Sequence, residues 1–214
     1  MEHERVLIPQ ADLDRQREFE EKIRGMFAAR EAHPVACVDT FGCQQNVADG
    51  QKLMGMLEVC GFTFTQDPKE ADLVVLNTCA IREHAEDRVF GNLGALTHTK
   101  KENPEQVIAL CGCMAQEPRV SERIRKSYPH VDLVFGPQAL WKFPELLWQV
   151  YETHKRVFSV QDEHGTIAEG IPVVREKGVK AWVSIMYGCN NFCSYCIVPY
   201  VRGRERSRDP QCAL

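Results

Sequence analysis

From residue 34 to residue 154, short apolar segments alternate with longer amphipathic ones, and this alternation limits the possible folds strongly. The apolar segments predict strands at residues 35–40, 62–65, 71–79, 106–113 and 131–136. The amphipathic segments predict helices at residues 46–60, 82–102, 118–128 and 139–154. Strands and helices that alternate at this pace form a parallel sheet with helices on both faces. We therefore expect the α/β class.

The chain divides into four predicted segments. Residues 1–33 form an N-terminal helical extension, because apolar residues recur there at helical spacing until Pro34. The α/β domain occupies residues 34–154. Residues 155–179 are polar, contain glycine and proline, and are typical of a linker. A new apolar strand in "AWVSIM" then opens the segment 180–214.

Three cysteines follow predicted strands of the α/β domain. They are Cys43 in "VACVDTFGC", Cys79 in "LVVLNTC" and Cys113 in "VIALCGC". The carboxyl ends of parallel strands lie along one edge of a sheet, where ligands collect. We therefore expect the three thiols to converge, as metal ligands or as buried structural cysteines.

Three further cysteines lie close together in the last segment. Cys189, Cys193 and Cys196 form the pattern C-x3-C-x2-C. A structural zinc site usually has four protein ligands, and no fourth Cys or His lies near these three. They suit instead an iron–sulfur cubane that leaves one iron open, with its other irons held by cysteine thiolates.

The composition and the N-terminal sequence indicate the cellular compartment in which these cysteines would function. The chain has ten cysteines and a net charge of −4, so contacts with nucleic acid would have to come from local basic patches. Its N-terminus lacks the pattern of a signal peptide, and no apolar run approaches a membrane span. We expect a cytoplasmic protein with no membrane partner, in which thiols stay reduced.

The other four cysteines, Cys37, Cys60, Cys111 and Cys212, are interpreted as structural, although Cys111 lies two residues from Cys113.

Several motifs occur together in one order over residues 35–208. They are "FGCQQN", "NTCAIREHAEDRVFGNLG", "CGCMAQ", "FGP" and "SIMYGCNNFCSYCIVPYVRGRERSR". This pattern resembles the methylthiotransferase family of radical S-adenosylmethionine enzymes. Two of the motifs, "IREHAEDRVFGNLG" and "SIMYGCNNFCSYC", favour the member that adds a methylthio group to C2 of N6-dimethylallyladenosine beside the tRNA anticodon.

The resemblance implies two [4Fe–4S] clusters and S-adenosylmethionine as cofactors. Cys189, Cys193 and Cys196 would hold the radical-generating cluster, with Tyr195 at the cofactor. The cysteines at the strand ends would hold an auxiliary cluster that supplies sulfur. The implied partners are the anticodon-loop adenosine of a tRNA and an electron donor such as a flavodoxin or ferredoxin, and we expect a monomer.

The resemblance also implies that residues 180–214 are the first strand and loop of a partial β/α barrel. We expect the chain to be a C-terminally truncated, inactive fragment of such an enzyme. Arg202 and Arg208, in a dense arginine patch, are candidates for binding substrate phosphate or carboxylate groups, or for forming internal salt bridges. The alternatives are a non-catalytic iron–sulfur protein, a methylthiotransferase that acts on threonylcarbamoyl-adenosine in tRNA, and a zinc-stabilised nucleic-acid-binding module.

Overall fold

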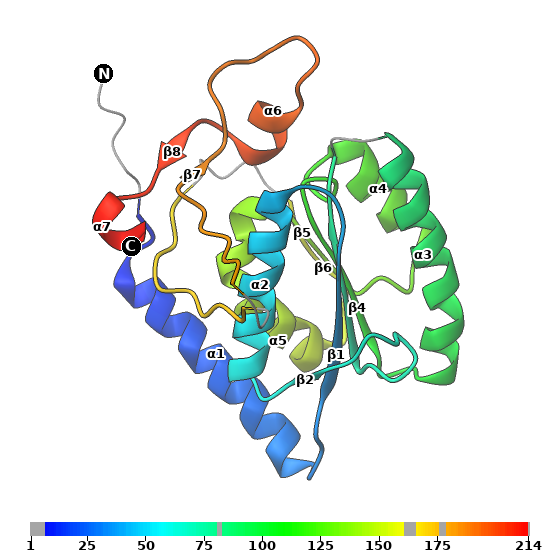
Figure 1. Ribbon diagram of the computed structural model, residues 1–214. Coiled ribbons are helices and arrows are strands. Elements are labelled where there is room, and N and C mark those ends of the chain that lie inside the picture. The colour runs from blue at the N-terminus through cyan, green and yellow to red at the C-terminus, as the bar shows by residue number, and fades with distance from the viewer. Residues whose placement is uncertain (1–6, 81–82, 161–165, 176–178, 214) are drawn as a thin grey trace.

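The computed structural model describes residues 7–80, 83–160, 166–175 and 179–213. Its centre is a parallel sheet of six strands in the order β2-β1-β3-β4-β5-β6 (Figure 1). The strands are β1 Val35–Thr40, β2 Thr63–Phe64, β3 Leu73–Thr78, β4 Val107–Gly112, β5 Leu133–Phe135 and β6 Val157–Ser159. The predicted α/β fold with a parallel sheet is therefore confirmed.

Helices cover both faces of this sheet, as predicted. One face carries α1 Gln10–Ala29, α2 Gln44–Val59 and α5 Phe143–Thr153, and the other carries α3 Glu83–Glu102 and α4 Pro118–Ser127. Side chains of β3 and β4 alternate between the two layers: Val75 and Ala109 pack under α1, α2 and α5, whereas Leu76 and Leu110 pack under α3 and α4. Both central strands are buried along their whole length, which explains their continuous apolar sequence.

The structure differs from the prediction in two places within the sheet domain. The sixth strand, β6, pairs with β5 beyond residue 154, where the sequence suggested a linker. The predicted helix over residues 139–154 is in fact a 3-10 turn, η1 Pro137–Lys142, followed by α5. Pro144 lies in the first turn of α5, where a missing N–H costs nothing.

The last part of the chain is small and lies beyond the carboxyl edge of the sheet (Figure 1). It contains β7 Met186–Tyr187, α6 Val198–Arg202, β8 Arg206–Ser207 and α7 Pro210–Ala213. The prediction of a strand over residues 181–186 is wrong in extent: only Met186 and Tyr187 form β7, which pairs antiparallel with β8. Among the described residues, 181–185 have no strand partner.

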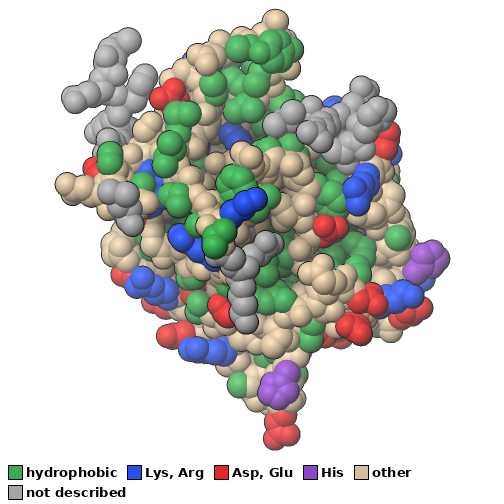
Figure 2. Space-filling view, in the orientation of Figure 1, with side chains coloured by type: hydrophobic (Ala, Val, Ile, Leu, Met, Phe, Trp, Pro, Cys, Tyr) green, Lys and Arg blue, Asp and Glu red, His purple; other side chains and the backbone are tan. Residues whose placement is uncertain are grey.

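Much of this last part carries apolar side chains at the surface. Ile185 is 67% exposed and Tyr200 is 68% exposed, whereas Val201 is buried against the sheet domain. Figure 2 shows apolar side chains gathered over the region that contains β7 and the loop before α6. Val201 is buried because α6 packs against η1.

Candidate functional site

The candidate site lies where the chain changes direction across the sheet. From β1 the chain adds β2 on one side and β3 on the other, so the loops after β1 and β3 diverge at the carboxyl edge. Ligands of open α/β sheets bind at this kind of position. Cys43, Cys79 and Cys113 follow β1, β3 and β4, which are adjacent strands.

The three sulfur atoms converge at this edge, as the sequence predicted. The Sγ atoms of Cys43 and Cys113 each lie 3.9 Å from Oδ1 of Asn46. The thiol of Cys79 hydrogen-bonds with Cys43. Cys60 lies elsewhere, buried at the C-terminal end of α2.

Two glycines let the loops approach the sulfur atoms closely. Gly42 has a φ of +108°, and a Cβ atom there would lie 2.7 Å from the Sγ of Cys79. Gly112 has a φ of +90°, and a Cβ atom there would lie 2.3 Å from the carbonyl oxygen of Thr78. Any other residue would be strained and would push the cysteine loops apart.

A buried arginine from the last part of the chain completes this site. Arg202 is 7% exposed. Its Nε donates to the Sγ of Cys113 at 3.0 Å, and one Nη atom donates to Oδ1 of Asn46 at 2.7 Å and to Oδ2 of Asp49 at 2.8 Å. Its guanidinium therefore joins α6 to the first turns of α2 and to a cysteine at the end of β4.

Asn46 holds the centre of the site in place. Its amide nitrogen donates to the carbonyl oxygens of Phe41 and Thr78, both at 2.9 Å. These bonds fix its Oδ1 toward the sulfur atoms and Arg202. Asn46 and Asp49 were not recognised from the sequence, although Asn46 follows "FGCQQ" directly and Asp49 lies one helical turn later on α2.

The environment affects the thiols differently. The pKa of Cys43 is lowered to about 5, mainly by the hydrogen bond with Cys79 and to a smaller extent by Asn46 and Arg202, which together outweigh the effect of burial. Burial raises the pKa of Cys113, while Arg202 opposes that rise. Burial raises the pKa of Cys111 far more, and its side chain packs in the core with Leu133 and Phe135. Of Cys43, Cys111 and Cys113, Cys43 is thus the thiol that ionises most readily.

The second group of cysteines lies in the loop between β7 and α6. Cys193 is exposed, and Cys189 and Cys196 are half-buried. Backbone bonds shape the loop: the N–H of Cys189 donates to the carbonyl oxygen of Gly203 at 3.1 Å, and that of Cys196 donates to Cys193 at 2.9 Å. Tyr195, predicted at the cofactor, is 90% exposed.

The second arginine candidate also has protein partners. Arg208 forms two bonds with the carboxylate of Glu169, at 2.8 and 2.6 Å, and a bond to the carbonyl oxygen of Ser184 at 2.9 Å. In this structure Arg202 and Arg208 thus form internal ion pairs, one of the two roles expected from the sequence. Binding of substrate by either arginine stays a prediction.

The strand-end residues have the chemistry that an iron–sulfur cluster requires. Within the described part of the chain, no three Cys, His, Asp or Glu side chains are arranged around a single metal ion. A cluster is larger than one ion, so its thiolates bind different irons rather than meet at one point. Three convergent thiols, the close approach at Gly42 and the cationic Arg202 fit such a group.

Comparison with known proteins agrees with this geometry. Residues 35–136 match the model described as "Uncharacterized protein family UPF0004". The chain is 49% identical, over 95% of its length, to a protein of Acetivibrio thermocellus named tRNA-2-methylthio-N(6)-dimethylallyladenosine synthase. It is 54% identical, over 80% of its length, to synthases of the same name from Caldicellulosiruptor saccharolyticus and Clostridioides difficile.

The chain spans only part of these relatives. It covers 43% of the Acetivibrio synthase and 36% of each of the other two. None of the described helices is both long enough and apolar enough to cross a membrane. The predicted resemblance to the methylthiotransferases is confirmed over most of the chain, and residues 35–136 match the UPF0004 family model.

Proposed function

We propose that the protein acts in tRNA methylthiolation, as a methylthiotransferase that modifies C2 of N6-dimethylallyladenosine beside the anticodon. The relatives that it resembles carry this substrate in their names. The convergence of Cys43, Cys79 and Cys113 at one sheet edge is the observation that carries the proposal. A cytoplasmic location and a flavodoxin or ferredoxin as electron donor are part of the same proposal.

In this proposal each group of cysteines holds one [4Fe–4S] cluster. Cys43, Cys79 and Cys113 hold the auxiliary cluster, and Cys189, Cys193 and Cys196 hold the cluster that binds S-adenosylmethionine, beside Tyr195. When bound, these groups supply the radical and the sulfur that the inert C2–H bond of adenosine requires.

The chain's own residues position and shield this chemistry. Asn46 and Arg202 orient Cys113, and the ready ionisation of Cys43 provides a thiolate without a general base. The buried loop around Gly112 limits the access of water to the auxiliary group from the side of β4.

Anaerobic reconstitution with iron and sulfide tests the assignment. We expect about eight irons per chain when both groups of cysteines hold cubanes. Changing Cys43, Cys79 and Cys113 together to Ala leaves about four irons, and so does changing the other three. Cys212→Ala is the matched control and retains about eight. Bound zinc in place of iron supports the nucleic-acid-binding module and contradicts the proposal.

Turnover separates the enzyme from a non-catalytic iron–sulfur protein. We expect the 214-residue polypeptide by itself to form no 5′-deoxyadenosine above a control without protein, because it spans only 36–43% of its relatives' length. Cleavage of S-adenosylmethionine by the polypeptide at the rate of a relative would contradict this expectation. A full-length relative that carries these 214 residues should methylthiolate dimethylallyladenosine tRNA rather than threonylcarbamoyl-adenosine tRNA.

A further inference from the structure

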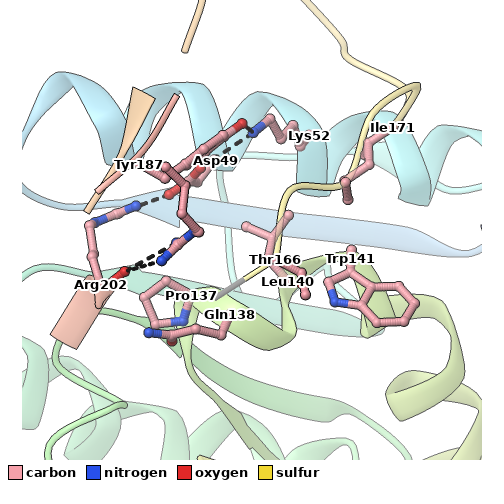
Figure 3. Close-up of a pocket in the computed structure, with 12 residues that line it drawn as sticks. Asp49, Lys52, Pro137, Gln138, Leu140, Trp141, Thr166, Ile171, Tyr187 and Arg202 are labelled. Carbon is pink, nitrogen blue, oxygen red and sulfur yellow. Dashed lines mark hydrogen bonds and ion pairs between the residues drawn. The ribbon is translucent and has the colours of Figure 1, made fainter. Parts of the chain in front are cut away.

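A pocket opens beside Arg202, between the sheet domain and the last part of the chain (Figure 3). Its polar wall comes from α2, which contributes Asp49 and Lys52, and from the β7–β8 ribbon, which contributes Tyr187 and Arg206. Its other wall comes from η1 and residues 166–171, with Leu140, Trp141 and Ile171 as apolar side chains.

Positive charge exceeds negative charge around this pocket. Lys52, Arg202 and Arg206 line it with a single carboxylate, that of Asp49. Asp49 already accepts the ion pair from Arg202 at 2.8 Å and lies 3.7 Å from the Nζ of Lys52, which also bonds to the hydroxyl of Tyr187 at 2.8 Å. Two cations, Arg202 and Lys52, therefore already share the carboxylate of Asp49.

Arg206 has no carboxylate partner among the described residues. Its two Nη atoms donate to the backbone carbonyl oxygens of Arg202 and Arg204, at 2.9 to 3.2 Å. Burial lowers the pKa of this guanidinium. Carbonyl oxygens solvate a cation but do not neutralise it, so a half-buried positive charge remains at the pocket wall.

Three residues that line the pocket carry buried polar atoms whose hydrogen-bonding capacity is unused. Within the described part of the chain, the donors Arg206 Nε and Trp141 Nε1 and the acceptor Gln138 Oε1 have no partner. All three residues line the pocket. Leaving such groups unpaired is unfavourable, and a ligand that accepts from both donors would satisfy them.

We propose that this pocket binds an oxyanion, a carboxylate or phosphate group. An oxyanion would pair with Arg206 and Lys52 and accept the hydrogen bonds of Arg206 Nε and Trp141 Nε1. The free space of about 40 Å³ suits such a small group, since one water position needs roughly 10–15 Å³. It is too small to enclose a nucleoside.

The oxyanion has two sources, a free small anion or a phosphate of an RNA backbone. Arg202 links the pocket to Cys113, so either source would place a negative group one side chain away from the cysteine edge. Binding of the free anion does not rest on the proposed function. The RNA source does rest on it, and the experiment separates the two.

The test is calorimetric titration of the 214-residue protein with inorganic phosphate and with acetate, at ionic strength held constant with chloride. We expect saturable binding of at least one of them, weakened at least tenfold in Arg206→Gln and measurably in Trp141→Phe, which loses only the donor N–H. Arg204→Gln is the matched control, because Arg204 is exposed and lies outside the pocket. Circular dichroism verifies that each variant is folded.

Absence of saturable binding, or equal binding by the parent and Arg206→Gln, overturns the proposal. Competition by a short single-stranded RNA assigns the site to a backbone phosphate, and lack of competition assigns it to a free anion. Iron content after reconstitution is measured on the same samples. If the parent protein binds neither phosphate nor acetate but takes up its iron, this inference is refuted and the proposed function stands.

Discussion

Replacing Arg202 by Met tests whether the ion pair at the cysteine edge holds the last part of the chain to the sheet domain. The side chains of Arg202 and Asp49 are 8% and 7% exposed. Met fills much of the volume of Arg but leaves the carboxylate of Asp49, Oδ1 of Asn46 and Sγ of Cys113 without their donor. Breaking a buried ion pair in this way costs about 3–5 kcal/mol.

The assay is urea and thermal unfolding of the 214-residue protein. For a chain of this size, 1 kcal/mol shifts the midpoint temperature by about 2–4 °C, so Arg202→Met should lower it by roughly 6–20 °C. The matched control is Arg204→Met, an exposed arginine stacked over Phe192, whose loss should cost less than about 1 kcal/mol.

A double variant separates the ion pair from general damage to the site. Arg202→Met combined with Asp49→Leu should recover at least about 2 kcal/mol relative to the sum of the single changes, because the carboxylate of Asp49 is no longer buried without Arg202. Lys52 keeps its hydrogen bond to the hydroxyl of Tyr187 in this variant. Hydrogen exchange should show that amides of α6 and β8 lose protection first. Equal losses in the Arg202 and Arg204 variants, or strictly additive losses in the double variant, would refute the reasoning.

Two further predictions concern the ends of the sheet domain. Burial raises the pKa of Glu20 from its ordinary 4.5 to about 7, so its contribution to stability is present below pH 4.5 and is lost as the pH rises through 7. Glu20→Gln should therefore flatten the decline in the urea midpoint between these pH values and raise the midpoint at pH 8, and an unchanged pH profile would contradict this. Limited proteolysis should cut first between residues 163 and 180 and leave a stable N-terminal fragment, because the described residues there form no helix and only one isolated bridge, Leu7 to Ile167. A first cut inside the sheet domain, identified by mass spectrometry, would be the contrary result.

The central sheet could be predicted because its strands differ strongly from their surroundings. β3 and β4 are buried on both faces, so burial selects an unbroken apolar run. β6 is different: all three of its residues are only half-buried, and its neighbours include Lys155 and Arg156. An edge strand of three residues leaves no periodicity to read, so its sequence was interpreted as linker.

The strand predicted over residues 181–186 shows the opposite error. Its apolar sequence is typical of a buried strand, yet Val183 and Ile185 are largely exposed and have no strand partner among the described residues. An apolar composition shows that a segment tends to form a strand. A strand forms only where a neighbouring strand is present to accept its hydrogen bonds.

Sheet topology dictates where the three cysteines of the site lie, but it does not dictate the ion pair between Arg202 and Asp49. Convergence of Cys43, Cys79 and Cys113 follows from parallel strands alone, because their carboxyl ends share one edge. The pairing of Arg202 with Asp49 joins residues 153 positions apart. Charge pairing over this separation leaves no local pattern, and the sequence pointed to Arg202 and Arg208 as candidates without indicating Asp49 as a partner.

Arg202 also explains how two groups of cysteines on different structural units come to lie on the same side of the molecule. It is six residues after Cys196, at the C-terminal end of α6, and its guanidinium is fixed at Cys113. The helix therefore lies beyond the carboxyl edge of the sheet (Figure 1), and the loop with Cys189, Cys193 and Cys196 enters it directly. A short covalent connection and the buried ion pair act together with the bonds of Lys52 to Tyr187 and of Gln138 to Val201 to hold the second group near the edge where the first converges. The arrangement would be lost if Arg202 were exposed and paired only with water, so the buried charge specifies position here rather than contributing stability alone.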